Sequence, residues 1–551
     1  MEVILLLVVV LGLVRFFGRG KQSSEPRPEV GPLGWVDGTK WATARPLARV
    51  ETRRFIRHPA FISGIVITPW MLTLATFDVD SWRDASGSIA LALVPLGWLT
   101  IVATHLLTTR PSRTGADALL ASLPTPQPVR TAGLLATASA AVLAATVLAV
   151  GDVLYLQNQT APIRGAVEWT EIGAGFLIVA GSAAVGVAVG RFFPHPAFGV
   201  LGAVACAFIQ VRFFEITSWP WNQPEASPYR FLGFLAPPTS VEPALEIRRA
   251  GWHLVYLFAL VVLMAGVALS RDGLRRPLSA LLGAAVVTAG VAGWAQTRPA
   301  TDAQVTRMVA YLHDAQARQQ CATDGAARFC WFADERPLMA GRKQRVKAVL
   351  ALLPAAAKPD TRKLEVTSRP PTVTGNSSCS PQPYGAGLLP AVAARMDPDR
   401  IWPHDGSIRP GTDNFPCGGR SVHGLFLAVQ TGAWAVGLPA SPHGRDQRCV
   451  ADRQARSVVA LWLGAAASPD GARSLGQIVG EESAGHLRFA DWDEPPMWGV
   501  TFAKADAVMA LSMLELPRSD VSKALEENWS HIVDPATSAS ALGSILGVGA
   551  S

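Results

Sequence analysis

Apolar segments long enough to cross a lipid bilayer follow one another through the first half of this chain. A membrane-spanning helix needs about 20 predominantly apolar residues, and lipid leaves backbone groups without hydrogen-bond partners unless the segment is helical. Gly186 and Gly190 form a small-xxx-small pair that favours close helix contact, the alternative being chance in a Gly/Ala-rich segment. We predict about seven membrane helices, at Ala60–Phe77, Ser88–Leu107, Thr131–Leu156, Glu171–Gly190, Ala197–Ile216, His253–Ser270 and Pro277–Gln296.

Charge composition separates this region from the rest of the chain. Only 17% of the 551 residues are charged, against about 25% in an average soluble domain, and the deficit lies between Ala60 and Gln296. Beyond Arg298 the density of charge is that of a soluble protein. We predict a short hydrophobic N-terminal segment (1–22), a cytoplasmic tail with an interfacial helix (23–59), a transmembrane domain (60–296) and an extracytoplasmic soluble domain (297–551).

Lysine and arginine in short loops set the predicted orientation, because cytoplasmic loops carry more of them. We assign the net charge of +7 to these loops and expect no nucleic-acid partner. Alternation over seven helices places everything after Gln296 outside the cell. Arg248 and Arg249 disagree with this orientation, although Glu242 and Glu246 lie close enough to neutralise them in part. The predicted cytoplasmic loops are Arg15–Arg57, Thr108–Arg130, Arg191–Pro196 and Arg271–Arg276.

The first apolar run, Val3–Phe17, is shorter than a typical span, and its basic residues follow the run. A signal peptide carries its positive charge before the apolar core. We interpret the run as a short extra anchor with its amino end outside, or as the result of a wrongly chosen start site.

The predicted soluble domain has mixed secondary structure. Strands are predicted at Ala327–Phe332 and Leu364–Ser368, separated from other elements by turn-rich sequence. We therefore expect an α-rich α+β domain after an α-helical polytopic membrane bundle. The predicted helices are Thr301–Gln320, Pro337–Leu353, Val422–Ala435, Asp452–Ala466, Ala503–Leu514 and Val521–Ile532.

Five of the six cysteines fall in the predicted soluble domain, and Cys206 lies in an apolar run. Cysteines in an oxidising compartment pair. Cys321 and Cys330 flank a turn-like Thr-Asp-Gly, so we predict a disulfide between them. Cys379, Cys417 and Cys449 receive no assigned pairs.

Two stretches of the predicted cytoplasmic side have helical patterns. Leu47–Pro59 alternates charged and apolar residues just before the first span, which is typical of a helix lying in the membrane interface. Arg113–Pro124 contains Leu119-Leu120-x-x-Leu123 with polar flanks, which favours either a partner surface or an ordinary loop helix lying on the bundle.

These stretches resemble the permease subunits of ABC-2 type ABC transporters, especially actinobacterial ones. The likeness rests on E-x-R-R-x-x-R-x-P before the first span and on L-L-x-S-L-P between the second and third. The resemblance implies that the first stretch is an interfacial helix and the second docks on the ATP-binding subunit. The interfacial residues are Glu51, Arg53, Arg54 and Arg57, and the coupling residues are Ala118, Leu119, Leu120, Ser122, Leu123 and Pro124.

The resemblance covers about Ala48–Ser270, with Trp219–Leu245 in the place of the family's partly re-entrant outer loop. The chain departs from the simplest pattern by a seventh helix and a long C-terminal region. Some actinobacterial members are similar there too, with a Cys-x8-Cys like Cys321/Cys330 and a Trp-x-x-(Ile/Leu)-x-Asp-Pro like Trp529–Pro535.

The function that the resemblance implies is the transmembrane subunit of an exporter in a bacterial cell membrane. The sequence has no G-x-x-x-x-G-K-[ST], so ATP would be used by a separate subunit and this chain would bind no cofactor directly. Its partners would be the ABC ATP-binding subunit, the lipid bilayer and a second permease copy in a homodimer or pseudo-dimer. Such a chain is not itself an enzyme.

Polar residues inside a predicted span are costly and therefore call for a role. Gln210, Arg212 and Glu215 gather at the outer end of the fifth span. They are candidates to line a transport path at a dimer interface. The simpler alternative is an interfacial ion pair of Arg212 with Glu215.

Two other classes of function stay open from the residues alone. The first is a membrane-anchored extracytoplasmic enzyme, for which Cys417 and His423 would be an imaginable nucleophile and base. The second is a binding or scaffold protein whose helices serve as an anchor. No H-E-x-x-H motif occurs, which argues against a zincin protease.

Overall fold

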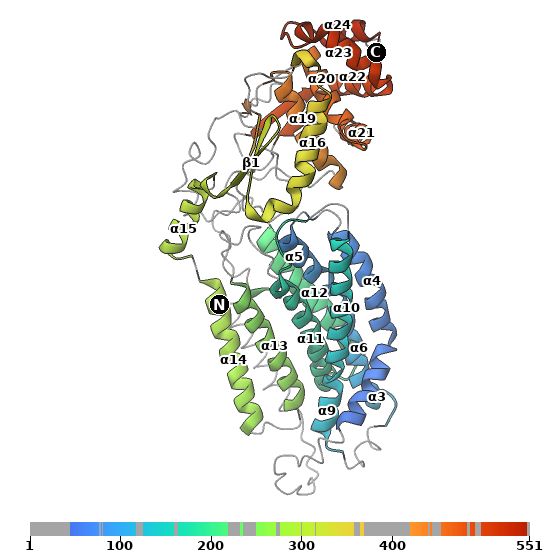
Figure 1. Ribbon diagram of the computed structural model, residues 1–551. Coiled ribbons are helices and arrows are strands. Elements are labelled where there is room, and N and C mark those ends of the chain that lie inside the picture. Colours follow the sequence, from blue (N-terminus) through green and yellow to red (C-terminus); the bar gives the residue numbers. More distant parts are fainter. Residues whose placement is uncertain are drawn as a thin grey trace, which may run out of the picture.

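The structure is a computed structural model in which a bundle of long helices is followed by a smaller part with helices and two sheets (Figure 1). Within α12 the described side chains end at Gln210, and within α19 they begin at Leu425. The described residues are 44–76, 79, 81–116, 125–158, 163–218, 232–234, 249–271, 276–298, 300–314, 316–357, 364–367, 419–438, 441–443, 453–481, 485–490 and 497–547. The predicted anchor Val3–Phe17 lies outside them.

The bundle consists of long apolar helices and one amphipathic helix, α3, that precedes them. Leu93 joins α5 to α6 and Ala136 joins α9 to α10, so that each pair forms one long apolar unit. The elements are α3 (Ala44–Ile56), α4 (Pro59–Thr76), α5 (Trp82–Ala92), α6 (Val94–Thr108), α7 (Arg110–Arg113), α9 (Gln127–Leu135), α10 (Thr137–Gln157), α11 (Trp169–Phe192), α12 (Ala197–Ser218), α13 (Ala250–Ser270) and α14 (Arg276–Thr297).

Six helices or helix pairs within the described residues are long and apolar enough to cross a membrane. They are α4, α5–α6, α9–α10, α11, α13 and α14, and they confirm six of the predicted spans as apolar helices. The segment predicted at Ala197–Ile216 is also helical, as α12. Its described apolar part ends at Gln210, so its role as a seventh span stays a prediction.

Helices α6 and α11 form the closest seam of the bundle. At Gly186 the α11 backbone lies against the Ile101 carbonyl oxygen and the Thr104 hydroxyl of α6, so that no β-carbon would fit. A β-carbon at Gly190 would come within 2.8 Å of Thr108 Cβ. The Gly186/Gly190 pair therefore makes the close helix contact that its spacing favours. Around this seam lie α4, α5, α10, α12 and α13, while α14 packs mainly on α13.

The C-terminal part contains two three-stranded sheets with helices packed beside them. One sheet has the order β1-β2-β3, with β1 and β2 antiparallel and β2 and β3 parallel; the other, β4-β6-β5, is antiparallel. The elements are α15 (Asp302–His313), η3 (Gln316–Arg318), β1 (Gln320–Asp324), β2 (Ala327–Trp331), η4 (Ala333–Leu338), α16 (Met339–Ala351), η5 (Ala355–Ala357), β3 (Leu364–Thr367), α19 (Gly419–Ala435), β4 (Ser441–His443), α20 (Ala455–Ala466), α21 (Gly471–Glu481), β5 (His486–Ala490), β6 (Met497–Ala503), α22 (Lys504–Glu515), α23 (Arg518–Ile532) and α24 (Ala539–Leu546).

All six helices predicted for this part are present, and so are the two predicted strands. The helix predicted over Thr301–Gln320 was too long: α15 ends at His313, and Gln320 already belongs to β1. The sequence reading missed α21, α24 and the strands β1, β4, β5 and β6. The largest hydrophobic cluster of this part lies between α19 and α20, where Trp462 is 1% exposed and Gly464 lets the two backbones approach.

Candidate functional site

Helix α3 holds the arginines of the first stretch at one end of the bundle. Its buried face carries Phe55, which is fully buried and stacks on Phe61 of α4 with ring centroids 4.2 Å apart. The opposite face exposes Arg53 and Arg54. Arg54 pairs with the half-buried Glu51 at 2.7 Å. An amphipathic helix of this kind buries its aromatic residue and leaves its cations in reach of lipid headgroups or a partner.

The second stretch, Arg113–Pro124, begins at the same end of the bundle as α3. Leu47 of α3 lies against Gly133 of α9, 3.2 Å from where a β-carbon would stand. At the α3–α4 corner, burial lowers the pKa of His58 and the positive charge of Arg113 lowers it further. Arg113, whose Nη2 donates to the Leu106 carbonyl at 2.7 Å, stands where α7 leads into the loop. The two stretches that carry the resemblance therefore meet at one end of the bundle, where α3 and α9 lie side by side (Figure 1).

The predicted coupling residues themselves, Ala118, Leu119, Leu120, Ser122, Leu123 and Pro124, lie outside the described residues. Both flanks of the loop are described. Residue Ala116 closes the turn after α7, and Thr125 accepts a hydrogen bond from Arg130 Nη2 at 2.9 Å on the way into α9. We call this end of the bundle the arginine-rich end, since it exposes Arg49, Arg53, Arg54, Arg57, Arg110 and Arg113.

The opposite end of the bundle, which faces the C-terminal part, exposes aromatic side chains instead. Trp169 at the start of α11, Trp252 at the start of α13 and Trp294 near the end of α14 are each between 39% and 59% exposed. The Arg298 guanidinium lies 3.4 Å above the Trp294 ring. Exposed tryptophans at helix ends are typical of a membrane–water interface.

Among the proposed transport-path residues, only the side chain of Gln210 is described. Gln210 is 5% exposed. The side chains of Arg212 and Glu215 lie outside the described set, so their pairing stays a prediction. Another intramembrane polar group is His105, fully buried, whose Nε2 lies 3.2 Å from the Phe193 carbonyl oxygen at the end of α11.

The sequence reading missed one buried polar contact of the bundle. His253 of α13 lies with Nδ1 3.1 Å from Gln296 Oε1 of α14 and with Nε2 3.1 Å from the Phe234 carbonyl oxygen. Tyr256, one turn further on, donates to the Leu232 carbonyl at 3.2 Å. These contacts hold residues 232–234 against α13 and α14. The available signal was a histidine and a glutamine at the ends of two predicted spans, where polar groups need partners.

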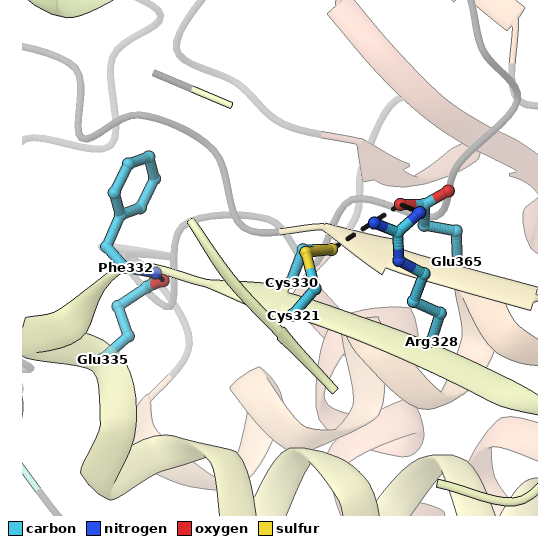
Figure 2. Close-up of a disulfide and its surroundings, with 6 residues drawn as sticks. All are labelled: Cys321, Arg328, Cys330, Phe332, Glu335 and Glu365. Carbon is cyan, nitrogen blue, oxygen red and sulfur yellow. Dashed lines mark hydrogen bonds and ion pairs between the residues drawn. A yellow bond between two sulfur atoms is a disulfide. The ribbon is translucent and has the colours of Figure 1, made fainter. Parts of the chain in front are cut away.

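The predicted disulfide is present. Cys321 and Cys330 stand directly opposite each other on β1 and β2, and their Cα atoms are 4.1 Å apart (Figure 2). On the neighbouring strand Glu365 pairs with Arg328 at 3.4 Å. The disulfide thereby fastens the edge strand β1 to the sheet, as the turn between the two cysteines predicts.

The described residues contain no group of three or more histidine, cysteine or acidic side chains placed to hold a metal ion. Cys417 lies outside the described residues, and the side chain of His423 is not described, so the imagined nucleophile and base stay untested.

The fold and the six apolar helices of the described residues define a multi-pass, mainly helical membrane protein, and Cys321 and Cys330 form a disulfide in its C-terminal part. No protein-family model, no curated protein and no solved structure matches the chain.

Proposed function

We propose that this chain is the transmembrane subunit of an ABC-2 type exporter in a bacterial cell membrane, driven by a separate cytoplasmic ATPase. The observation that supports it best is that α3 packs on α9, which follows the 117–124 loop, while Arg113, which precedes the loop, acts on His58 at the α3–α4 corner. An ATPase bound there would contact the loop and the helix at once. Its movement would reach α4 through the Phe55–Phe61 contact and α6 through Arg113.

The charge distribution supports the proposed orientation. Exposed arginines gather at the α3 end, which is the arrangement expected when the α3 end is cytoplasmic. The C-terminal part then lies outside the cell, where a disulfide such as Cys321–Cys330 is stable. The permease would work as a homodimer or pseudo-dimer that alternates between two arrangements of its helices.

Co-purification tests this function. The full-length chain is purified from its own host, and the bound proteins are identified and assayed for ATP hydrolysis. We expect a P-loop ATPase to accompany the wild type, and the triple variant Leu119→Asp, Leu120→Asp, Leu123→Asp to lose it. The matched control, Ser112→Asp with Thr114→Asp, adds acidic groups at exposed positions of the same end and should retain the ATPase.

Retention of the ATPase and of its stimulated hydrolysis by the triple variant would overturn the proposal. So would a wild-type protein that purifies without any P-loop partner.

A further inference from the structure

The face of α3 that points away from the bundle carries exposed arginines. Arg49 and Arg53 lie one turn apart on this face, and Arg57 follows directly after the helix ends. Phe55 on the opposite face is fully buried and stacks on Phe61 of α4, which fixes the rotation of α3 about its own axis. The three guanidinium groups are therefore held on the outside of the bundle.

Within the described residues, these arginines have no carboxylate partner. Helix α3 contains a single acidic residue, Glu51, and its carboxylate lies 2.7 Å from the Arg54 guanidinium. No ion pair or hydrogen bond between described residues engages the guanidinium of Arg49, Arg53 or Arg57. The flanks of the neighbouring loop, 105–116 and 125–136, contain no Asp or Glu. The arginine-rich end thus carries a surplus of positive charge, which attracts an anionic partner.

The position of the arginines along the bundle indicates which anions lie within reach. Helix α4 begins at Pro59, two residues after Arg57, and Figure 1 shows α3 beside this start. Helix α4 exposes Ile62, Val66 and Trp70 at intervals of one turn. Because α4 is long and apolar enough to cross the membrane, lipid acyl chains are the expected surroundings of this face. Arg57 therefore stands at the level where acyl chains give way to phospholipid headgroups.

Exposed aliphatic side chains accompany the arginines of α3. Val50 is 43% exposed and Ile56 is 47% exposed. Arginines together with exposed aliphatic groups are typical of a helix at a membrane surface, where cations contact headgroups and apolar groups enter the acyl boundary. An acidic protein surface would pair with the arginines but would bring polar groups against Val50 and Ile56. Lipid is therefore the better match.

We propose that α3 binds anionic phospholipid headgroups, with Arg49, Arg53 and Arg57 at the phosphate groups. Val50 and Ile56 would lie in the acyl boundary below them. Each arginine at an anionic membrane surface strengthens binding by about fivefold. Lipid bound in this way would restrain α3 at the start of α4. The inference rests on the membrane-spanning bundle and goes beyond the proposed ATPase contact, on which it does not depend.

Hydrogen exchange of the α3 backbone amides tests the proposal. The full-length chain, purified free of any ATPase, is placed in nanodiscs of phosphatidylcholine alone or of phosphatidylcholine and phosphatidylglycerol in equal amounts. We expect exchange in α3 to be about threefold slower or more in the anionic nanodiscs, because bound lipid stabilises the helix by mass action. High salt should reduce the difference, since it screens the headgroup charges.

A variant with Arg49→Gln, Arg53→Gln and Arg57→Gln should exchange in α3 at nearly the same rate in both nanodiscs. Exchange of the α11 amides, which belong to the α6–α11 seam, shows whether the variant is folded. A control that removes three exposed arginines from the C-terminal part should keep the wild-type difference. Its substitutions are Arg307→Gln, Arg473→Gln and Arg518→Gln.

Equal exchange of wild-type α3 in the two nanodiscs would overturn the proposal, and so would an undiminished difference in the folded triple variant. Soluble polyglutamate added to phosphatidylcholine nanodiscs tests an acidic protein as the partner. If it slowed exchange in α3 as much as phosphatidylglycerol does, this face would be a docking surface for an acidic protein and the lipid proposal would be wrong. Little or no effect of polyglutamate is the result that the proposal predicts.

Discussion

The seam between α6 and α11 differs from the contact between the bundle and the three-stranded module, the group formed by β1, β2, η4, α16 and β3. In the seam, Gly186 and Gly190 bring one backbone against Ile101, Thr104 and Thr108, and no charge takes part. At the module contact, Gly165 N of the loop before α11 donates a hydrogen bond to the Asp334 carbonyl of η4 at 3.2 Å. Close packing of small residues resists change, whereas a main-chain hydrogen bond contributes only about 1 kcal/mol to stability. The comparison predicts that the seam is the more stable of the two contacts.

The largest effect is expected inside the module, where a buried ion pair loses one partner. Arg342→Met leaves the Glu335 carboxylate buried without its cation, which should cost about 3–5 kcal/mol. Lys347→Met is the control, because its pair with Asp324 is at the surface and should cost less than about 1 kcal/mol. Hydrogen exchange of the α16 backbone amides measures the loss of stability in both variants. Equal losses in the two variants would contradict the assignment of a buried pair.

The seam should be almost as sensitive. Gly186→Leu would force its side chain into Ile101 and Thr104 and should destabilise the bundle by about 3 kcal/mol. Gly290→Leu on α14 meets open space and should leave the thermal unfolding temperature close to that of the wild type. The measurement is thermal unfolding of the detergent-solubilised chain, and comparable losses at both positions would remove the distinction between seam and surface.

The disulfide should matter somewhat less. Replacing Cys321 and Cys330 together by serine opens a short loop and should cost the module about 2–3 kcal/mol. Hydrogen exchange of the module's backbone amides measures this loss of stability. A reducing agent should have little further effect on exchange in the double variant. If the module's amides in the wild type stayed equally protected from exchange after reduction, the disulfide would contribute nothing to the stability of the module.

The smallest effect is expected at Asp324, which Lys347 holds by a hydrogen bond and by its charge, so that the pKa of Asp324 is lowered. Such a group stabilises the folded state above its ordinary pKa, and the gain is lost as pH falls through the lowered value. The Asp324 side chain is 31% exposed and its pair lies at the surface, so the loss of module protection on acidification should be slight. A gain of protection in β1 on acidification would contradict the lowered pKa.

Much of the fold was predictable because its signal is local. Six apolar runs became helices of membrane-crossing length, and the turn between Cys321 and Cys330 placed a disulfide. The starts of α5 and α9 were missed, since Arg83 and Asp84 interrupt the apolar pattern at the start of α5 and Gln127, Pro128 and Arg130 do so at the start of α9. Strand β4 was missed because it is short and pairs with β6, far along the chain.

The candidate site was likewise predictable where its signal is local, and was missed where it depends on contacts between distant elements. The amphipathic pattern of α3 predicted a helix whose Arg53 and Arg54 are exposed, and the structure has it. Its closeness to Gly133 and Arg113 depends on contacts between separate elements, which no local pattern encodes. The contacts of His253 with Gln296 and Phe234, and of Gly165 with Asp334, are long-range in the same way.

The most direct test of the transporter proposal is site-specific cross-linking from the arginine-rich end. A cysteine at Leu120 is paired with a control cysteine at the exposed Trp169, at the opposite end of the bundle. Cross-linking is carried out in native membranes, with a membrane-impermeant thiol reagent applied to intact cells in parallel. The account predicts that Leu120→Cys links to a P-loop ATPase and resists the external reagent, while Trp169→Cys does neither. External labelling of Leu120→Cys without any ATPase adduct would contradict it.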